Sequence, residues 1–507
     1  MRTLPFLALS SIALTLACSA TTSAPQGGVP VDAGDEDTIP TTGMELVKGL
    51  PITEIAMFQG PKVSLESAGA KVTSRKAQVV AGRTGILRVF VKPDGDWAPR
   101  DVVATLTLEG GAGKKVFSDK KAPSAASTDA DLGSTFNFDI PADTIAPDTT
   151  FSVSLKTDPG QASAGGSDAA QYPADGSTDS LDAKSTGDAL QVMIVPVQYN
   201  ADGSGRLPDT SEAQLELYRA GFMKLYPARK VEITVRSKPF PWSTAIQRTG
   251  AGFSELLNAV IRLRQTDGAP KGTYYYGAFA AGTSFNTWCG GGCVAGLSPL
   301  AQNPGDTWTA ASVGLGFSGE RSIGTATHEV GHGHGRNHAP CQPGGGTING
   351  RDTAYPYTGA QLGVWALDIE KKSLVNPTKN TDFMGYCDPT FVSDYNFGAL
   401  ATRMAYVYGA AYEVRGPAQN VKLLAVDAEG RLTPAGDVFT SEPAFGDART
   451  VSLALSDGSE TSATGAFYPY DHLPGGLLVV PVGTSVVRSV EVRDLVPGVV
   501  SKLELAR

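Results

Sequence analysis

The chain has 507 residues, which is too long for one hydrophobic core and predicts about three domains. Its composition is 41% hydrophobic and 18% charged, with 59 glycines and 33 prolines, and this is typical of a folded, loop-rich protein with much β-structure rather than a disordered chain. The net charge of −9 leaves no basic surplus to neutralise phosphates, which argues against a nucleic acid partner and against binding to an anionic membrane surface.

The first 18 residues have the pattern of an export signal. Arg2 precedes an apolar stretch from Leu4 to Ala17 that is too short to span a bilayer. The stretch ends in Leu-Thr-Leu-Ala-Cys, which is similar to the lipobox of bacterial lipoproteins except that Thr15 replaces the usual leucine. Cys18 is therefore a candidate for lipidation, with simple secretion as the alternative. We expect an exported protein, either secreted or held in the cell envelope, in the outer membrane, by this lipid alone.

The next segments predict a tether and a β-domain. Residues 19–43 are rich in Thr, Pro, Gly and acidic residues, and such a composition predicts a disordered tether. Residues 44–158 alternate apolar and polar side chains between Gly, Pro and Asp turns, as an antiparallel β-sandwich does. Residues 159–188 are dominated by Gly, Ser, Ala and Asp and predict a linker or a long disordered loop.

From residue 189 to 412, strands and helices are expected to alternate. The predicted strands are Leu190–Val197, Val231–Val235 and Thr273–Phe279, with shorter ones around Val294–Leu297 and Ser312–Leu315. The predicted helices are Ser211–Tyr226, where Ser211 and Gln214 form a capping box, Phe253–Arg264, and Asp394–Tyr412 with Ser393 as its cap. This order predicts a mixed sheet flanked by helices, hence an α/β domain. Residues 413–507 return to short alternating strands and predict a second sandwich-like β-domain.

Four cysteines remain when Cys18 is set aside, and all lie in the central region: Cys289, Cys293, Cys341 and Cys387. An exported protein meets an oxidising compartment, so disulfides are expected. The plainest pairing joins Cys289 to Cys293 and Cys341 to Cys387. Four cysteines nevertheless allow three connectivities, and free thiols are the alternative.

One motif carries the chemistry, with the pattern His-Glu-x-x-His-x-x-Gly-x-x-His. His328 and His332 are four residues apart, so both imidazoles lie on one face of a helix. Gly335 can take the left-handed conformation that ends the helix and turns His338 back toward the same ion. Three imidazole nitrogens at about 2.0–2.1 Å leave a fourth position for water, which is the arrangement of one catalytic Zn²⁺ ion. Glu329, beside the first ligand, is the candidate general base.

The motif, together with Asp-Phe-Met-Gly-Tyr at 382–386, resembles the metzincin zinc metallopeptidases. The resemblance implies that Met384, 46 residues after His338, lies beneath the histidines as a structural support, and that Tyr386 binds zinc or stabilises the tetrahedral intermediate. It also implies that the strand after Cys293 pairs with an extended substrate. The chain is similar to large exported bacterial metzincins, some of which act on glycoproteins. We therefore expect a zinc endopeptidase acting on extracellular proteins or glycoproteins.

Several residues have a plainer explanation. His334 points about 200° away from the zinc face of a helix, so a surface or supporting position is expected. His472 has no partner histidine nearby and predicts a surface loop residue. Asp382 or Asp394 could orient a zinc ligand, although helix capping explains Asp394 equally well.

Two other function classes stay open. One is a surface-attached binding or adhesion lipoprotein with an inactive or latent zinc domain, against which Glu329 argues, since a purely structural site needs no carboxylate beside an open zinc position. The other is a metal-dependent esterase or deacetylase, which would use the same catalytic parts.

Overall fold

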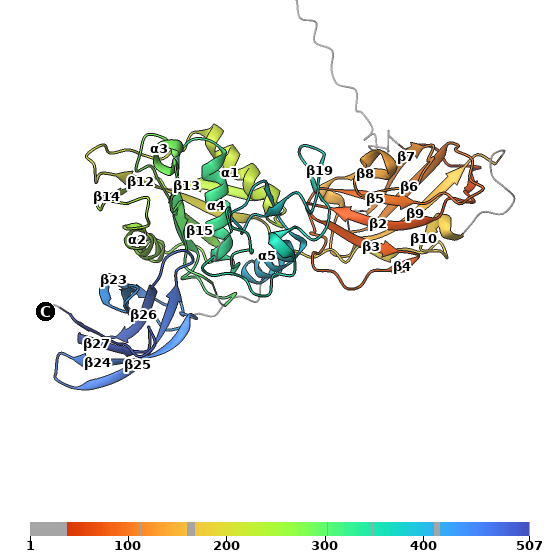
Figure 1. The fold of residues 1–507 in the computed structure, drawn as a ribbon. Helices are drawn as coiled ribbons and strands as arrows, with labels where there is room; N and C mark the ends of the chain where they lie inside the picture. The colour runs from red at the N-terminus through yellow and green to blue at the C-terminus, as the bar shows by residue number, and fades with distance from the viewer. Residues whose placement is uncertain are drawn as a thin grey trace, which may run out of the picture.

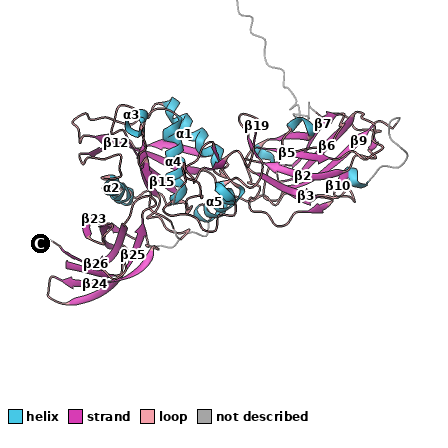
Figure 2. Ribbon diagram, viewed as in Figure 1, coloured by secondary structure: helices cyan, strands magenta, loops and turns pink. Residues whose placement is uncertain are grey.

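The computed structural model describes residues 38–111, 113–159, 168–301, 303–345, 348–409 and 416–505. It shows a multidomain, mostly β architecture with several separate sheets and few helices (Figures 1 and 2). The predicted export signal, Cys18 and most of the tether fall outside these residues. Within the described ranges, no helix has the length and apolar character needed to cross a membrane.

The N-terminal part consists of two antiparallel sheets. The first has the order β1 (Glu45–Leu46), β9 (Thr150–Thr157), β6 (Val102–Gly110) and β7 (Gly113–Lys121), and β9 also pairs with β10 (Gln171–Tyr172) and β11 (Asp179–Ser180). The second has the order β4 (Ala70–Lys71), β3 (Lys62–Ser67), β2 (Ile52–Phe58), β5 (Gly85–Val91) and β8 (Phe136–Ile140). Alternate side chains of both sheets, such as Leu87, Leu106 and Val153, share one buried core.

The linker prediction for residues 159–188 is wrong over much of its length. Strands β10 and β11 pair with β9, so the segment from residue 171 to 180 belongs to the N-terminal sheet. Tyr172 is buried and its ring lies 5.7 Å from that of Phe151, while Leu181 is fully buried. These two apolar side chains hold the segment on the core despite its many small polar neighbours.

The central part is built on a mixed sheet. Its strand order is β13 (Val231–Val235), β12 (Leu190–Tyr199), β15 (Thr273–Phe279), β17 (Ala311–Leu315) and β16 (Gly296–Leu297), with β14 (Phe240–Trp242) also paired to β12. All these pairings are parallel except that of β16 with β17, which makes β16 an antiparallel edge strand. Short pairs β18 (Ala366–Asp368) with β19 (Ser373–Val375), and β20 (Thr381–Asp382) with β21 (Thr390–Phe391), lie in the loops that follow.

Helices cover both faces of this sheet because its strands are apolar on both sides. Tyr274 and Tyr276 of β15 pack toward α1 (Glu212–Leu225) and α4 (Glu320–Gly333), whereas Tyr275 packs toward α2 (Phe253–Thr266). Two further α-helices in the described ranges are α3 (Phe285–Cys289) and α5 (Asp394–Val407). The central strands and helices therefore follow the predicted alternation closely.

Capping contacts fix where α1 and α4 begin. The Ser211 side chain accepts a hydrogen bond from the Gln214 amide, which is half of the predicted capping box. The Gln214 side chain does not complete the box; it instead accepts from Gly319 N at 2.8 Å and donates to Gly319 O at 3.3 Å. Because Gly319 is the residue before α4, the start of α1 is joined to the start of the helix that carries the histidine motif.

The C-terminal part is one seven-stranded antiparallel sheet rather than a two-sheet sandwich. Its order is β23 (Leu432–Thr440), β22 (Gln419–Val426), β26 (Gly476–Gly483), β25 (Glu460–Pro469), β24 (Asp447–Leu455), β27 (Val487–Arg493) and β28 (Val500–Glu504). Leu478 and Val480 of β26 face the domain's own core, whereas Leu477 and Val479 pack with the α2 residues of the central core. One face of the sheet thus packs on the central domain, while the other face encloses the domain's own core, to which strands from both ends of the sheet contribute.

The terminal parts attach to different sides of the central part, the N-terminal sheets in red and orange and the C-terminal sheet in blue (Figure 1). On the N-terminal side, the Leu367 amide donates to Gly60 O at 2.8 Å. On the C-terminal side, the turn between β25 and β26 reaches into the central part, where Tyr470 forms a β-bridge with Pro299.

Candidate metal centre

Helix α4 and the turn after it bring the three motif histidines together. His328 and His332 lie on successive turns of α4, and both are buried. Gly335 has a φ of 81°, and its amide donates to His332 O at 2.8 Å, so the chain turns back there as expected. The His338 amide then donates to Gly350 O at 2.9 Å, which fixes the returning segment.

The Nε2 atoms of the three histidines converge. His332 Nε2 lies 3.1 Å from His328 Nε2 and 3.1 Å from His338 Nε2. Each Nδ1 faces a backbone carbonyl instead: Phe383 O at 2.9 Å for His328, Arg336 O at 2.6 Å for His332 and Asn349 O at 2.5 Å for His338. A carbonyl oxygen can only accept, so each Nδ1 carries the proton and each neutral ring turns an Nε2 lone pair inward.

This donor set fits a metal ion. Three inward lone pairs cannot hydrogen-bond to one another, because none of them brings a proton, and a cation at their centre satisfies all three. Two ligands bound tetrahedrally at 2.0–2.1 Å lie about 3.3 Å apart, close to the separations found. Burial lowers the pKa of His328 to about 3 and that of His338 to about 4, so both rings are neutral, as metal binding requires.

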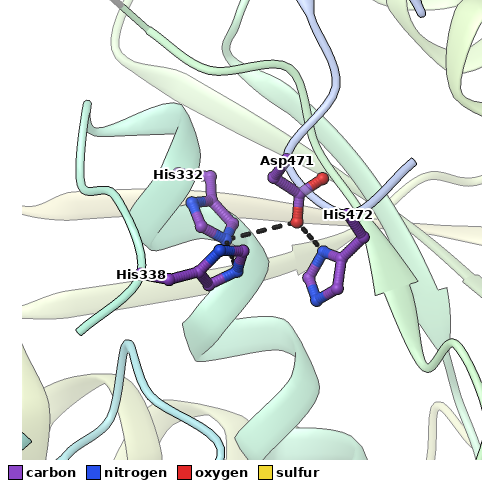
Figure 3. A group of neighbouring side chains, drawn as sticks. All are labelled: His332, His338, Asp471 and His472. Carbon is purple, nitrogen blue, oxygen red and sulfur yellow. Dashed lines mark hydrogen bonds and ion pairs between the residues drawn. The ribbon is translucent and has the colours of Figure 1, made fainter. Parts of the chain in front are cut away.

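The predicted surface position of His472 is wrong, because the turn between β25 and β26 inserts Asp471 and His472 into the same centre (Figure 3). Asp471 Oδ2 lies 3.2 Å from His332 Nε2 and accepts a hydrogen bond from His472 Nδ1. The His472 ring centroid lies 4.9 Å from that of His338. His332, His338, Asp471 and His472 form a buried group that could hold a metal ion.

Asp471 is a residue of the candidate site that the sequence analysis does not predict. The residue lies 133 positions after His338 in another sheet, so no spacing rule connects the two. The available signal was weak: one histidine of the chain's five lies outside the motif, and an aspartate precedes it.

Residues 382–386 lie directly beneath α4. Met384 is fully buried, and a Cβ placed on Gly331 would meet its Sδ at 2.5 Å, so the methionine packs against the helix between the two ligand turns. Met384 O accepts from the Ala339 amide at 3.0 Å. The segment thus touches both α4 and the strand-like stretch that carries His338.

Neither aspartate considered as a partner for a ligand histidine takes that role. Asp382 Oδ1 accepts from Met384 N at 2.9 Å, and its Oδ2 accepts from Ser393 N at 2.8 Å, so this carboxylate ties the methionine turn to the start of α5. Asp394 accepts from the Tyr357 hydroxyl at 2.6 Å, away from the histidines. Backbone carbonyls orient all three rings instead.

Glu329 and Tyr386 lie beside the candidate metal position, where they face a cleft. They line a cleft of about 450 Å³ together with His328, His472 and the segment from Cys293 to Gly296 at the edge strand β16. Glu329 Oε2 is buried and has no hydrogen-bond partner in the part of the chain that the structure describes, and burial raises the pKa of this carboxyl well above its ordinary value. The Tyr386 hydroxyl lies 2.7 Å from His338 Nε2, and burial raises its pKa.

His334 points away from the other histidines, as its helical position predicts, but it is buried rather than exposed. Its Nδ1 donates to Val330 O at 2.8 Å, and its ring stacks on that of Tyr274 with centroids 4.1 Å apart. Burial lowers its pKa to about 3, so the ring is neutral. His334 therefore joins α4 to the central sheet.

The expected disulfides are confirmed. Cys289 pairs with Cys293, and Cys341 pairs with Cys387. The second bond adjoins the metal centre, since the Tyr386 amide donates to Cys341 O at 2.9 Å. It fixes the segment that carries Tyr386 to the segment that follows His338.

Comparison with models of known protein families finds no match for this chain, and comparison with curated proteins finds no significant relative.

Proposed function

We propose that this protein is an exported zinc-dependent endopeptidase, of metzincin type, that hydrolyses peptide bonds in extracellular proteins or glycoproteins. The observation that carries the proposal is the position of Glu329. Its Oε2 is buried and has no hydrogen-bond partner among the described residues, it lies beside converging imidazole nitrogens, and the residue lines a cleft that can admit a substrate. A centre kept only for structure gains nothing from such a group.

The ligand chemistry favours zinc. Three neutral imidazoles form the usual protein set of a catalytic zinc site, which keeps a further position for water or substrate. When bound, the ion would polarise a substrate carbonyl and make the attacking water more acidic. His328, His332 and His338 would hold it, each oriented by the carbonyl at its Nδ1.

The remaining groups have defined tasks around the scissile bond. Glu329 accepts the proton of the attacking water and then delivers it to the leaving amine. Tyr386 donates its hydroxyl hydrogen to the carbonyl oxygen as negative charge develops there.

An edge strand in the wall of the cleft suits an extended peptide. The edge strand β16 and the preceding residues from Cys293 form one wall of the cleft. An edge strand offers unpaired backbone groups with which an extended peptide can pair. Such pairing depends on backbone hydrogen bonds more than on substrate side chains, so it fits a broad class of protein substrates.

The test compares the wild type with Glu329→Gln and with Glu320→Gln, a matched control in the exposed first turn of the same helix. Zinc content is measured first, followed by hydrolysis of a panel of unfolded proteins and mucin-type glycoproteins. We expect near-stoichiometric zinc in all three proteins, and cleavage by the wild type and Glu320→Gln alone. Zinc bound by all three proteins without cleavage of any substrate would favour the surface-attached binding protein.

A further inference from the structure

The turn between β25 and β26 places a carboxylate, that of Asp471, at the candidate metal centre, and a role for it there rests on the proposed function. Asp471 Oδ2 lies 3.2 Å from His332 Nε2 (Figure 3). His332 Nδ1 donates to Arg336 O, so Nε2 has a lone pair and no proton to give to a carboxylate. Two acceptors at this distance repel each other unless a cation lies between them. The separation is close to the value of about 3.3 Å for two ligands of one tetrahedral zinc ion.

The position of Asp471 is built into the fold. Its Oδ1 accepts from the Ser298 amide at 2.8 Å, and its own amide donates to Ser298 O at 3.2 Å. The preceding residue, Tyr470, is buried and donates its hydroxyl hydrogen to Asn258 Oδ1 at 3.0 Å. These bonds join the turn to the residue after β16 and to α2, so Oδ2 is held toward the histidines.

The charge of Asp471 also requires a partner. Its side chain is 0% exposed, and its ion-pair contacts within the described ranges are with His332 and His472 rather than with a lysine or arginine. A buried carboxylate is normally paired with a cation or bound to a metal. His472 Nδ1 donates to Oδ2, which is the kind of support that ligand carboxylates receive from their surroundings.

We propose that Asp471 is a fourth protein ligand of the metal, supplied by the C-terminal β-domain. In this conformation it takes the position that water must occupy for hydrolysis, so the structure represents a closed, latent centre. Activity then requires Asp471 to leave the metal. The C-terminal domain is thereby part of the metal centre and controls its open position.

The test uses the full protein with zinc replaced by cobalt, and compares the wild type with Asp471→Asn and Asp437→Asn. Asp471→Asn keeps an acceptor for the Ser298 amide but removes the charged oxygen, whereas Asp437 is exposed on β23 of the same sheet. The visible spectrum of the cobalt protein reports the ligand set, and the rate of metal loss to a chelator reports its strength. Thermal unfolding checks that each variant is folded.

We expect Asp471→Asn to shift the cobalt spectrum and to lose metal at least about tenfold faster, since even groups that only support a ligand contribute this much. We also expect it to hydrolyse peptide substrates faster than the wild type, because the water position is open. Asp437→Asn should match the wild type in every measurement.

The outcomes separate this inference from the proposed function. An unchanged spectrum and an unchanged rate of metal loss in Asp471→Asn, with hydrolysis by the wild type, would show that Asp471 is not a ligand. The proposed peptidase activity would then still stand. A shifted spectrum and faster metal loss in Asp471→Asn, without hydrolysis by any variant, would support Asp471 as a ligand. The same result would contradict the proposed peptidase activity. Slower hydrolysis by Asp471→Asn than by the wild type would overturn the closed state.

Discussion

At the scale of single residues, Tyr386 offers a direct test of transition-state stabilisation. Its hydroxyl lies 2.7 Å from His338 Nε2 and lines the cleft. Tyr386→Phe removes this hydroxyl alone, and the loss of one donor to a developing oxyanion typically lowers kcat on the order of 100-fold. We expect that fall in steady-state kinetics, with zinc content and KM near those of the wild type.

Tyr357→Phe is the matched control for Tyr386→Phe. It removes a tyrosine hydroxyl bonded to Asp394, away from the histidines, and should leave kcat within about twofold of the wild type. Loss of zinc from Tyr386→Phe, or an effect on KM alone, would contradict a role in the transition state.

The five histidines show how far local spacing carries a prediction. Helical geometry and the freedom of Gly335 predict that His328, His332 and His338 face one point, and their Nε2 atoms do converge. The same geometry predicts the direction of His334 but not its burial, because Tyr274 comes from a strand 60 residues earlier. The prediction of a surface position for His472 is wrong because its neighbours come from the central part, which it meets only when the C-terminal sheet docks there.

At the scale of secondary structure elements, the contact of α4 with the methionine turn decides how firmly the ligands are held. A Cβ on Gly331 would meet Met384 Sδ at 2.5 Å, and Met384 is fully buried. Gly331→Ala gains about 1 kcal/mol in helix propensity. We nevertheless expect a net loss of about 1–3 kcal/mol, since the added methyl group overfills a packed site.

A double-mutant cycle identifies Met384 as the source of that loss. Met384→Ala alone creates a cavity and should cost about 2–5 kcal/mol. In the Met384→Ala background, Gly331→Ala should be neutral or stabilising, because the methyl group then enters free space. Denaturant unfolding with metal bound measures all four proteins. Equal effects of Gly331→Ala on the free energy of unfolding in both backgrounds would show that the Met384 side chain does not press on α4.

The sequence predicts helices and strands correctly where the apolar pattern is long. It predicts them less well where one or two buried side chains determine whether a segment joins the core. The alternation in the central region predicts β15 and the first residue of α2, and the structure has both there. Composition favours a linker for residues 159–188, yet Tyr172 and Leu181 bind part of it to the N-terminal core. Average polarity cannot show that two buried side chains outweigh their small polar neighbours.

At the scale of the whole molecule, Arg83 joins the N-terminal sheets to the central part. Its guanidinium is buried and donates to Met223 O at 2.7 Å, Tyr226 O at 2.9 Å and Ala228 O at 2.7 Å. These carbonyls lie at the C-terminal end of α1, where the helix dipole favours a cation. Burial lowers the pKa of Arg83 to about 10, so it keeps its charge at neutral pH.

The contact continues toward the metal centre. Tyr226, whose carbonyl accepts from Arg83, donates its hydroxyl hydrogen to Thr327 O at 2.6 Å, one residue before His328. The N-terminal domain therefore supports the end of α1, and that end supports the ligand helix. The sequence has no signal for this chain of contacts, since Arg83 lies in a loop of ordinary composition far from the motif.

Arg83→Leu should uncouple the N-terminal domain. The variant leaves three carbonyls of the central part, and Gln59 O of its own domain, without their charged donor. Hydrogen bonds to charged groups each contribute about 1.5–3 kcal/mol. We expect denaturant unfolding to separate into two transitions and proteases to cut between the domains. The control is Lys114→Ala, whose side chain is 63% exposed in the same domain and which should behave as wild type.

Because Tyr226 also bonds Thr327, metal loss to a chelator should be faster in Arg83→Leu than in the wild type, though slower than in Asp471→Asn. A single transition at the wild-type midpoint would mean that other contacts, such as the hydrogen bond from the Leu367 amide to Gly60 O and the packing of Leu367 against Phe58, hold the domains together without this arginine.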